Sequence, residues 1–376
     1  MNDMPSDKTI SNKENSDPRK ENEAASPPPP QTPAQPKRKK WGCVGIGAIL
    51  IGLASLTVAA GLCLIAALAL LSKLPGLQKN YYFEEEFVEG NQFSSNKIVI
   101  IEVSGIILGG GDSSMYAVAS SEEICKKLRA CAEDSSVKAV IVRLNTPGGE
   151  VTASDVIHHE ILKLRQEYEM PVIACMESMA ASGGYYVASA CEHIVANRLT
   201  TTGSIGVIIE TYNYGELMAK LGLKSEIYKS GPMKDILDGS RPRTEAEKEI
   251  VQKLVNDTYA EFLKIVAKGR SHTGITMEKL RSTNIADGRI FDGAEAQKLG
   301  LVDELGYLED AIAVATKRAK LGDGEYQVVR YHEPFSLMRF LGEASGPSKA
   351  LRVELPATQR SLNLDPGKLY FLPSAW

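Results

Sequence analysis

The chain has 376 residues, of which 43% are hydrophobic, and a formal net charge of −4 at pH 7. That length accommodates one or two domains with sizeable cores, and the small acidic balance gives no electrostatic basis for binding nucleic acid. Its six cysteines show neither a disulfide framework nor metal-type spacing. We therefore expect the four cysteines beyond residue 120 to be small buried side chains, with a disulfide between two of them left open.

The N-terminal part of the chain changes abruptly in composition. Residues 1–40 are polar and rich in proline and end in four basic residues, which predicts a disordered tail. No charged residue follows between Trp41 and Leu71, and about 20 apolar residues suffice to cross a bilayer, so we predict one transmembrane helix over residues 41–72. A cleaved signal peptide is the alternative, but its apolar core is shorter and starts nearer the N-terminus. The basic cluster before the span predicts a cytoplasmic N-terminus and places everything after residue 72 outside the cytoplasm.

Beyond a predicted linker over residues 73–96, apolar β-branched runs alternate with helical patterns. The runs cover residues 98–103, 137–144, 171–176 and 207–209, and the helical patterns cover residues 121–132, 152–166, 181–190 and 244–268. This alternation predicts an α/β domain over residues 97–320, in which helices cover a buried parallel sheet. Residues 321–376 are less periodic and are assigned to a C-terminal extension of unknown role.

The long helix predicted over residues 244–268 has two recognisable features. Thr244 and Glu247 form a capping box at its start. Its apolar residues form one stripe, which we expect to pack against the sheet or against a neighbouring subunit. The stripe consists of Ile250, Val251, Leu254, Val255, Phe262, Leu263 and Val266.

Ser182 is the candidate nucleophile. It lies among small residues at the start of a predicted helix that follows a buried strand, so its hydroxyl is expected at the C-terminal edge of the sheet, where open parallel sheets bind ligands. A serine hydroxyl needs a base and a set of oxyanion donors. The turn containing Gly148 and Gly149 joins another buried strand to a helix and is the candidate oxyanion hole, with the Gly183 N–H as a further donor.

The candidate base is a lysine, because none of the five histidines is placed convincingly for this role. Lys234 follows Pro232 and Met233, which offer apolar cover, and burial favours the neutral amine that a base requires. Asp235 is expected to point away from that amine. Lys229 is expected to be a solvated surface residue.

Five segments together resemble the signal peptide peptidase A family, whose members are membrane-anchored Ser-Lys proteases. The segments, in matching order and spacing, are Asn145–Glu150, Ser178–Tyr186, Thr202–Val207, Lys229–Asp235 and Ala286–Gly293. The resemblance covers residues 97–318 and implies a Clp-protease and crotonase-like fold. It implies that Ser182 is the nucleophile, that Lys234 is the general base, that Ser204 helps to hold the lysine amine and that Gly148 and Gly149 contribute to the oxyanion hole.

The same resemblance carries expectations about the assembly. The chain has one copy of each motif and so resembles the short form, in which subunits form a homo-oligomeric ring or dome and each active site takes its serine and lysine from adjacent protomers. The implied substrates are cleaved signal peptides and other short unfolded apolar segments. The implied location is a bacterial inner membrane, with the catalytic domain in the periplasm or outside the cell. A Ser-Lys mechanism requires no metal or organic cofactor.

Three other functions compete with this prediction. A Clp-like Ser-His-Asp protease needs a histidine about two dozen residues after the serine, where this chain has Gly206 and no histidine nearby. A crotonase-like acyl-transfer enzyme would use the same oxyanion geometry without a nucleophile, but a domain outside the cytoplasm has little access to acyl-CoA. The third alternative is a non-catalytic membrane scaffold, which would draw on the long helix and the polar tail.

Overall fold

The computed structural model describes residues 83–110, 118–332 and 369–371, together with Leu56, Val58 and residues 60–63. The chain divides into two units, Met1–Leu77 and Gln78–Trp376, and all the elements below belong to the second. The predicted tail over residues 1–40 and most of the predicted span over residues 41–72 lie outside the described residues. Within the described ranges, no helix is both long enough and apolar enough to cross a membrane.

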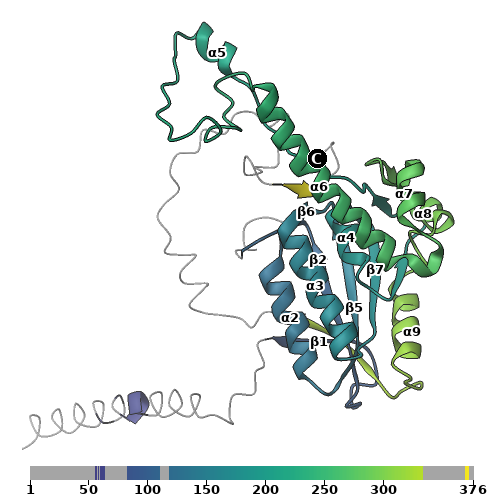
Figure 1. The fold of residues 1–376 in the computed structure, drawn as a ribbon. Helices are drawn as coiled ribbons and strands as arrows, with labels where there is room; N and C mark the ends of the chain where they lie inside the picture. Colours follow the sequence, from purple (N-terminus) through teal and green to yellow (C-terminus); the bar gives the residue numbers. More distant parts are fainter. Residues whose placement is uncertain are drawn as a thin grey trace, which may run out of the picture. The chain divides into compact units, whose positions relative to one another are not determined.

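A nine-stranded sheet forms the centre of the described part of the second unit (Figure 1). The strands run in the order β1-β12-β2-β5-β7-β8-β11, and β9 and β10 continue from the end of β7. Their bounds are β1 Glu84–Gly90, β2 Lys97–Ser104, β5 Val137–Thr146, β7 Val172–Ala181, β8 His193–Ala196, β9 Thr201–Gly203, β10 Ile290–Phe291, β11 Glu304–Leu305 and β12 Gln327–His332. All pairs from β12 to β11 are parallel, whereas β1 is antiparallel to β12 and β10 to β9. The predicted α/β class with a largely parallel sheet is confirmed.

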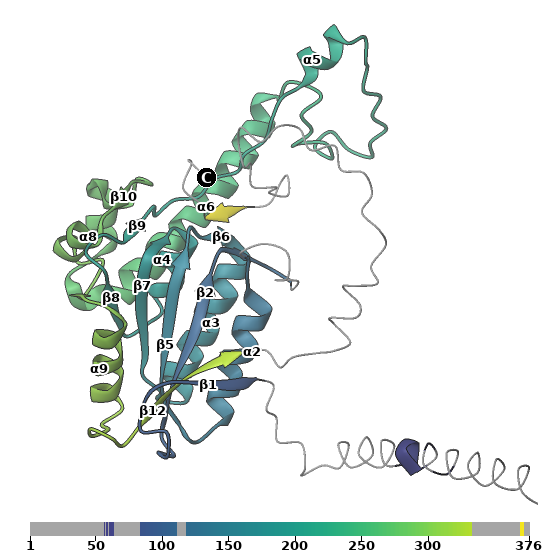
Figure 2. The same ribbon diagram turned by 180° about the vertical axis from the view of Figure 1, so that it is seen from behind.

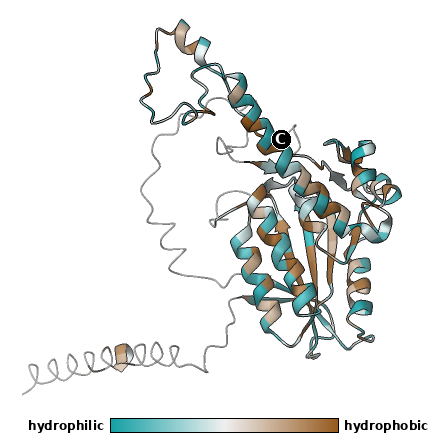
Figure 3. Ribbon diagram, viewed as in Figure 1, coloured by the Kyte–Doolittle hydropathy of each residue, from teal (hydrophilic) through white to brown (hydrophobic). Residues whose placement is uncertain are grey.

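Helices cover both faces of this sheet, which explains why its central strands are apolar throughout rather than alternating. Val140 and Val142 of β5 pack in the larger core, beneath α2 (Ser121–Glu133), α3 (Val151–Glu167) and α4 (Gly183–Ala188), while Ile141 packs in the smaller core under α9 (Leu308–Arg318). Figure 2 shows the sheet from the opposite side, and Figure 3 shows hydrophobic residues concentrated on its central strands. The arrangement fits the predicted Clp and crotonase-like fold.

A second, smaller sheet lies beside the turn between β5 and α3. Its order is β13-β6-β3-β4, with β3 at Ile106–Leu108, β4 at Val118–Ser120, β6 at Gly149–Glu150 and β13 at Tyr370–Phe371. β13 comes from the end of the chain and pairs antiparallel with β6. The C-terminal extension therefore reaches the turn that contains Gly148 and Gly149.

The helix α6 (Glu245–Gly269) begins with the predicted capping box of Thr244 and Glu247. The apolar stripe of α6 is buried only in the C-terminal half of the helix, at Phe262, Leu263 and Val266. Ile250 and Leu254, in the N-terminal half, are exposed. Before it comes a long excursion, residues 210–244, here called the arm, which contains the short helix α5 (Gly215–Lys220). Both ribbon views show α5 and the start of α6 projecting away from the sheet (Figures 1 and 2). The predicted packing of the stripe is thus confirmed for its three C-terminal residues.

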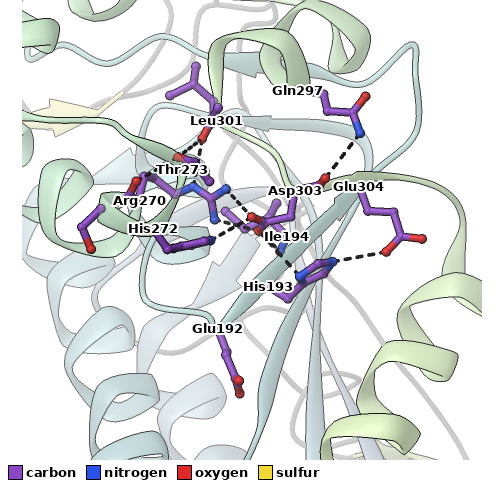
Figure 4. A network of polar contacts seen from close by, with 12 residues as sticks. Glu192, His193, Ile194, Arg270, His272, Thr273, Gln297, Leu301, Asp303 and Glu304 are labelled. Carbon is purple, nitrogen blue, oxygen red and sulfur yellow. Dashed lines mark hydrogen bonds and ion pairs between the residues drawn. The ribbon is translucent and has the colours of Figure 1, made fainter.

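A polar network fastens the end of α6 to the sheet (Figure 4). The side chain of Arg270 is fully buried and makes two hydrogen bonds of 2.7 Å to the carboxylate of Asp303, which also accepts from the backbone N–H of Ile194 at 2.7 Å and contacts His272 at 2.9 Å. Four short elements follow α6 in the chain: the 3₁₀ turns Ser271–Thr273 and Asn284–Ala286 and the helices α7 (Met277–Ser282) and α8 (Gly293–Leu299). A buried guanidinium is tolerated here because its charge is paired and hydrogen-bonded.

Several predicted boundaries need correction. No strand forms over residues 207–209, where Ile208 makes only an isolated bridge to Tyr370. The helix predicted from residue 181 begins at Gly183, because β7 continues to Ala181. The segment expected to be a linker contains β1, and the expected extension contains β12 and β13. β1 escaped detection because it is a mostly exposed edge strand with three consecutive glutamates and no apolar alternation.

The four cysteines beyond residue 120 are buried, as predicted, and all four carry free thiols. Burial raises the pKa of Cys125, Cys175 and Cys191 to about 12. These side chains act as small apolar core residues, and no disulfide joins the described cysteines.

Candidate active site

Ser182 occupies the sharp junction between β7 and α4. Its backbone has φ 52° and ψ −110°, a left-handed φ that is uncommon for a residue with a Cβ atom and that tends to mark functional sites. Two bonds of 2.8 Å fix this conformation: the Ser182 N–H donates to the Gly203 carbonyl, and its own carbonyl accepts from the Tyr186 N–H. The side chain is fully buried, and its Oγ has no hydrogen-bond partner among the described residues. Leaving a buried hydroxyl unpaired costs about 1–3 kcal/mol, which calls for a functional explanation.

The structure brings the three predicted oxyanion glycines together. Gly148 has φ 106°, and a Cβ atom built on it would lie 2.6 Å from the Gly183 nitrogen. A Cβ atom on Gly183 would in turn lie 3.0 Å from the Gly149 nitrogen. Only glycine allows backbones to approach this closely. The Gly148 N–H donates to Thr146 Oγ1 at 3.0 Å, so Gly148 supplies space and conformation, and Gly149 and Gly183 are the better candidates for donors.

Ser204 directly follows the neighbouring strand β9, as Ser182 directly follows β7. Ala181 pairs with Gly203 across β7 and β9, so the two serines follow paired residues at the same edge of the sheet. Ser204 is buried, has φ 50°, and donates its N–H to the Arg289 carbonyl at 2.8 Å. The segment around Arg289 forms β10, which holds β9 in place. The sequence motif over residues 286–293 therefore supports the position of Ser204.

Within one chain, Lys234 does not lie at the site of Ser182. It lies in the exposed arm, and its ammonium makes no hydrogen bond or ion pair with the described residues. The neighbouring Asp235 binds Lys229 at 2.7 Å and the Arg241 Nε at 2.9 Å, so its carboxylate is engaged away from Lys234, as expected. Hydrogen bonds from Arg241 and Lys229 hold the pKa of Asp235 well below its usual range. Lys229 is thus an ion-pair partner rather than a purely solvated residue.

The histidines make contacts elsewhere. His193 contacts Glu304, His272 contacts Asp303, and His332 contacts Glu86. His158 is buried on α3 with its ring against Tyr186, and burial lowers its pKa to about 4. The fifth, His159, is exposed on α3. Within the described ranges, none of the five side chains bonds Ser182 Oγ, which leaves the site without a histidine base.

An aromatic cluster beside the serine was missed by the sequence analysis. The Tyr186 ring lies 5.1 Å from that of Phe262 on α6 and 5.0 Å from that of Phe371 on β13, and its hydroxyl donates to Asp155 at 2.7 Å. Tyr186 could have been found, because it is four residues from Ser182 and returns to the same side of a helix. Phe371 gave no such signal, because it lies far along the chain in a segment without periodicity.

Comparison of the sequence with known proteins identifies the family of this chain. Residues 164–322 match the model of peptidase family S49. A protein of Enterococcus faecium, named provisionally as signal peptide peptidase SppA, is 37% identical over 255 residues, which cover 66% of this chain and 72% of that relative. A protein of Synechocystis, named provisionally as protease slr0021, is 38% identical over 245 residues, covering 65% and 82%.

A plant relative extends the similarity. The chloroplastic serine protease SPPA of Arabidopsis thaliana is 36% identical over 253 residues, covering 66% of this chain and 36% of that protein. The fold and these matches define the class of the protein, which is a serine protease. More particularly, the chain belongs to peptidase family S49 and is an SppA-like protease. Ser182, Ser204 and Lys234 lie inside the range that matches the family model.

Proposed function

We propose that this chain is a membrane-bound serine endopeptidase with Ser182 as its nucleophile and Lys234 as its general base. The observation that carries the proposal is the strained and fully buried Ser182, whose unpaired hydroxyl lies at the junction beside Gly149 and Gly183. Strain and an unsatisfied hydroxyl are costs that a purely structural serine would not need to bear.

The proposed reaction follows from these positions. Ser182 Oγ attacks the peptide carbonyl carbon, and the N–H groups of Gly149 and Gly183 stabilise the oxyanion that forms. The neutral amine of Lys234 accepts the serine proton and passes it to the leaving amine. The same amine then activates the water that hydrolyses the acyl-enzyme. Ser204, at the same edge of the sheet, holds the lysine amine in position. These steps use no cofactor.

The lysine is proposed to come from a neighbouring copy of the chain. The arm that carries Lys234 exposes several large apolar side chains, including Leu217, Leu221 and Tyr228. An exposed apolar surface of this kind marks an interaction site. Insertion of the arm against an adjacent protomer would bury the amine and so favour its neutral form. A homo-oligomeric ring or dome would repeat this contact at each interface.

The membrane location and the substrate complete the proposal. The uncharged stretch over residues 41–72 anchors the chain in the lipid of a bacterial inner membrane, with the N-terminus in the cytoplasm and the catalytic domain outside it. The proposed substrates are cleaved signal peptides and other short unfolded apolar segments. The name of the Enterococcus faecium relative supports the first of these.

The first test measures hydrolysis of apolar fluorogenic peptides by the full-length chain. Ser182→Ala and Lys234→Ala are each expected to lower kcat by about 10³-fold or more, as for other catalytic serines and bases. Ser178→Ala and Lys220→Ala are matched controls, because both residues are exposed and lie in the same segments. A serine-reactive phosphonate should label wild type on Ser182. Full activity in Ser182→Ala would refute the assignment and favour a crotonase-like enzyme or a scaffold.

A further inference from the structure

Arg241 joins two carboxylates near the turn that carries Lys234. Its guanidinium donates to the Asp235 carboxylate at 2.9 Å and to the Asp235 carbonyl at 3.4 Å. The same guanidinium donates to the two carboxylate oxygens of Glu247 at 2.9 and 2.5 Å. Bonds of this kind use the rigid fork of the guanidinium and restrict the geometry of both partners. Arg241 therefore connects Asp235, which follows Lys234 in the chain, to the first turn of α6.

Glu247 is a fixed anchor for this connection. Its side chain is 2% exposed, and its carboxylate accepts from the Thr244 N–H at 2.8 Å. These contacts belong to the capping box at the start of α6. The Asp235 side chain is also enclosed, at 9% exposed, whereas the neighbouring Lys234 is exposed. The turn that presents Lys234 is thus tied through Arg241 to a helix of 25 residues.

Two cations compensate the charge of Asp235 next to the proposed base. Besides the bonds from Arg241, the Asp235 carboxylate accepts from the Lys229 ammonium at 2.7 Å. Bonds from Arg241 and Lys229 hold the pKa of Asp235 well below its usual range, so the carboxylate is ionised at neutral pH. Asp238 is a further carboxylate close by, and it accepts from the Ser240 N–H at 2.7 Å. An uncompensated carboxylate beside a lysine favours the protonated amine, which cannot accept a proton.

We propose that Arg241 is a positioning residue for Lys234, which fixes the turn that carries the amine and compensates the negative charge of Asp235, so that the amine stays neutral. This inference rests on the proposed role of Lys234 as general base and adds the residue that controls its protonation. Consecutive Cα atoms are about 3.8 Å apart, so the Asp235 charge acts on the amine at short range. Without Arg241, Asp235 keeps Lys229 and Glu247 keeps its capping bond, but one positive charge is lost. That loss favours the protonated amine.

The first test measures kcat/KM against pH in the full-length enzyme. The acid limb of this profile reports the protonation of the essential base in the free enzyme. Arg241→Gln should move the limb to higher pH by about one pH unit, because the amine then holds its proton more strongly. Arg241→Lys keeps the charge and should restore the wild-type limb. Arg243→Gln is the matched control, because it also removes one positive charge from the arm, but Arg243 donates to Thr211 instead. Equal limbs in Arg241→Gln and Arg243→Gln would overturn the inference.

A charge-balanced double variant separates charge compensation from a purely structural role. Asp235→Asn removes the carboxylate and leaves both cations, so it should move the acid limb to lower pH. This variant also decides the question if Arg241→Gln does not fold. The double variant Arg241→Gln, Asp235→Asn loses one charge of each sign and should return the limb close to its wild-type position. A limb shifted as far as in Arg241→Gln alone would overturn the charge compensation.

A measurement without catalysis separates this inference from the proposed function. Acetic anhydride acetylates a neutral amine but not an ammonium, and mass spectrometry gives the extent of acetylation of Lys234 at each pH. In the full-length Ser182→Ala chain, the pH of half-maximal acetylation should rise by about one pH unit when Arg241→Gln is added. It should return when Asp235→Asn is added as well. An equal pH in all three chains would overturn the inference even if Lys234 is the base. The expected shift, together with full activity in Lys234→Ala, would refute only the proposed base.

Discussion

Ser182 and Ser204 are enclosed by the sheet and its helices, whereas the arm of residues 210–244 exposes large apolar side chains along much of its length. In the core, backbone hydrogen bonds to Gly203 and Arg289 fix both serines in unusual conformations. In the arm only Gly239 is buried. This contrast indicates that the core of one chain fixes the proposed nucleophile and its proposed oxyanion donors, while the residue proposed as the base lies on a surface suited to contact with another copy.

The largest expected effect lies in the core, at the ion pair shown in Figure 4. Asp303→Asn leaves the fully buried Arg270 without its charged partner and should lower the free energy of unfolding by about 3–5 kcal/mol. Urea unfolding of the full-length chain measures this loss. Asp287→Asn is the matched control, since its pair with Arg289 is exposed and should contribute little to the free energy of unfolding. Equal losses in the two variants would contradict the contrast between buried and exposed contacts.

The same carboxylate gives the core a predicted pH dependence. Burial alone would raise the pKa of Asp303, but the charge and hydrogen bonds of Arg270, with smaller contributions from His272 and the Ile194 N–H, lower it to about 2. In the unfolded chain an aspartate has a pKa of about 3.9. Its stabilising contribution, on the order of 2 kcal/mol, is therefore present above about pH 4 and lost as the pH falls toward about 2. Asp303→Asn should lack this acid-sensitive component.

A much smaller effect on stability is expected in the arm. Leu221→Glu replaces an apolar side chain that is 66% exposed and should change the free energy of unfolding of a single chain by no more than about 0.5 kcal/mol. It should nevertheless weaken association between copies, which sedimentation velocity in detergent measures. Glu216→Gln on α5, the helix that ends just before Leu221, is the control for a change at an exposed polar residue. Unaltered association in Leu221→Glu would show that this surface is not the interface.

Much of the fold was predictable because its signals are local. β2, β5, α2, α3 and the capping box of α6 follow from apolar runs, helical periodicity and a cap that act within a few residues. The edge strand β1 and the strand β12 were not found, because β12 comes from the far end of the domain to pair with β1 and β2. Single-chain patterns carry no information about such distant partners.

The candidate site also contains residues that local patterns predict and residues that depend on distant parts of the chain. The proximity of Ser182, Gly149 and Gly183 was predictable, because the turns after the neighbouring parallel strands β5 and β7 meet at one edge of the sheet. The catalytic roles of these residues stay a proposal. Ser204 joined them through β9, although the strand was expected a few residues later. Phe371 was missed because its contact depends on the last residues of the chain returning to β6. The place of Lys234 relative to Ser182 depends on a second copy, which stays a proposal.

Mixing two inactive variants tests this division between core and arm most directly. Full-length Ser182→Ala and Lys234→Ala chains are dissociated together, reassembled in equal amounts and assayed on an apolar peptide. If each site takes its serine from one protomer and its lysine from the next, random assembly restores about a quarter of wild-type activity, because one pairing in four is intact. No activity in an assembly shown to contain both variants would contradict the account and require Ser182 and Lys234 to act within one chain.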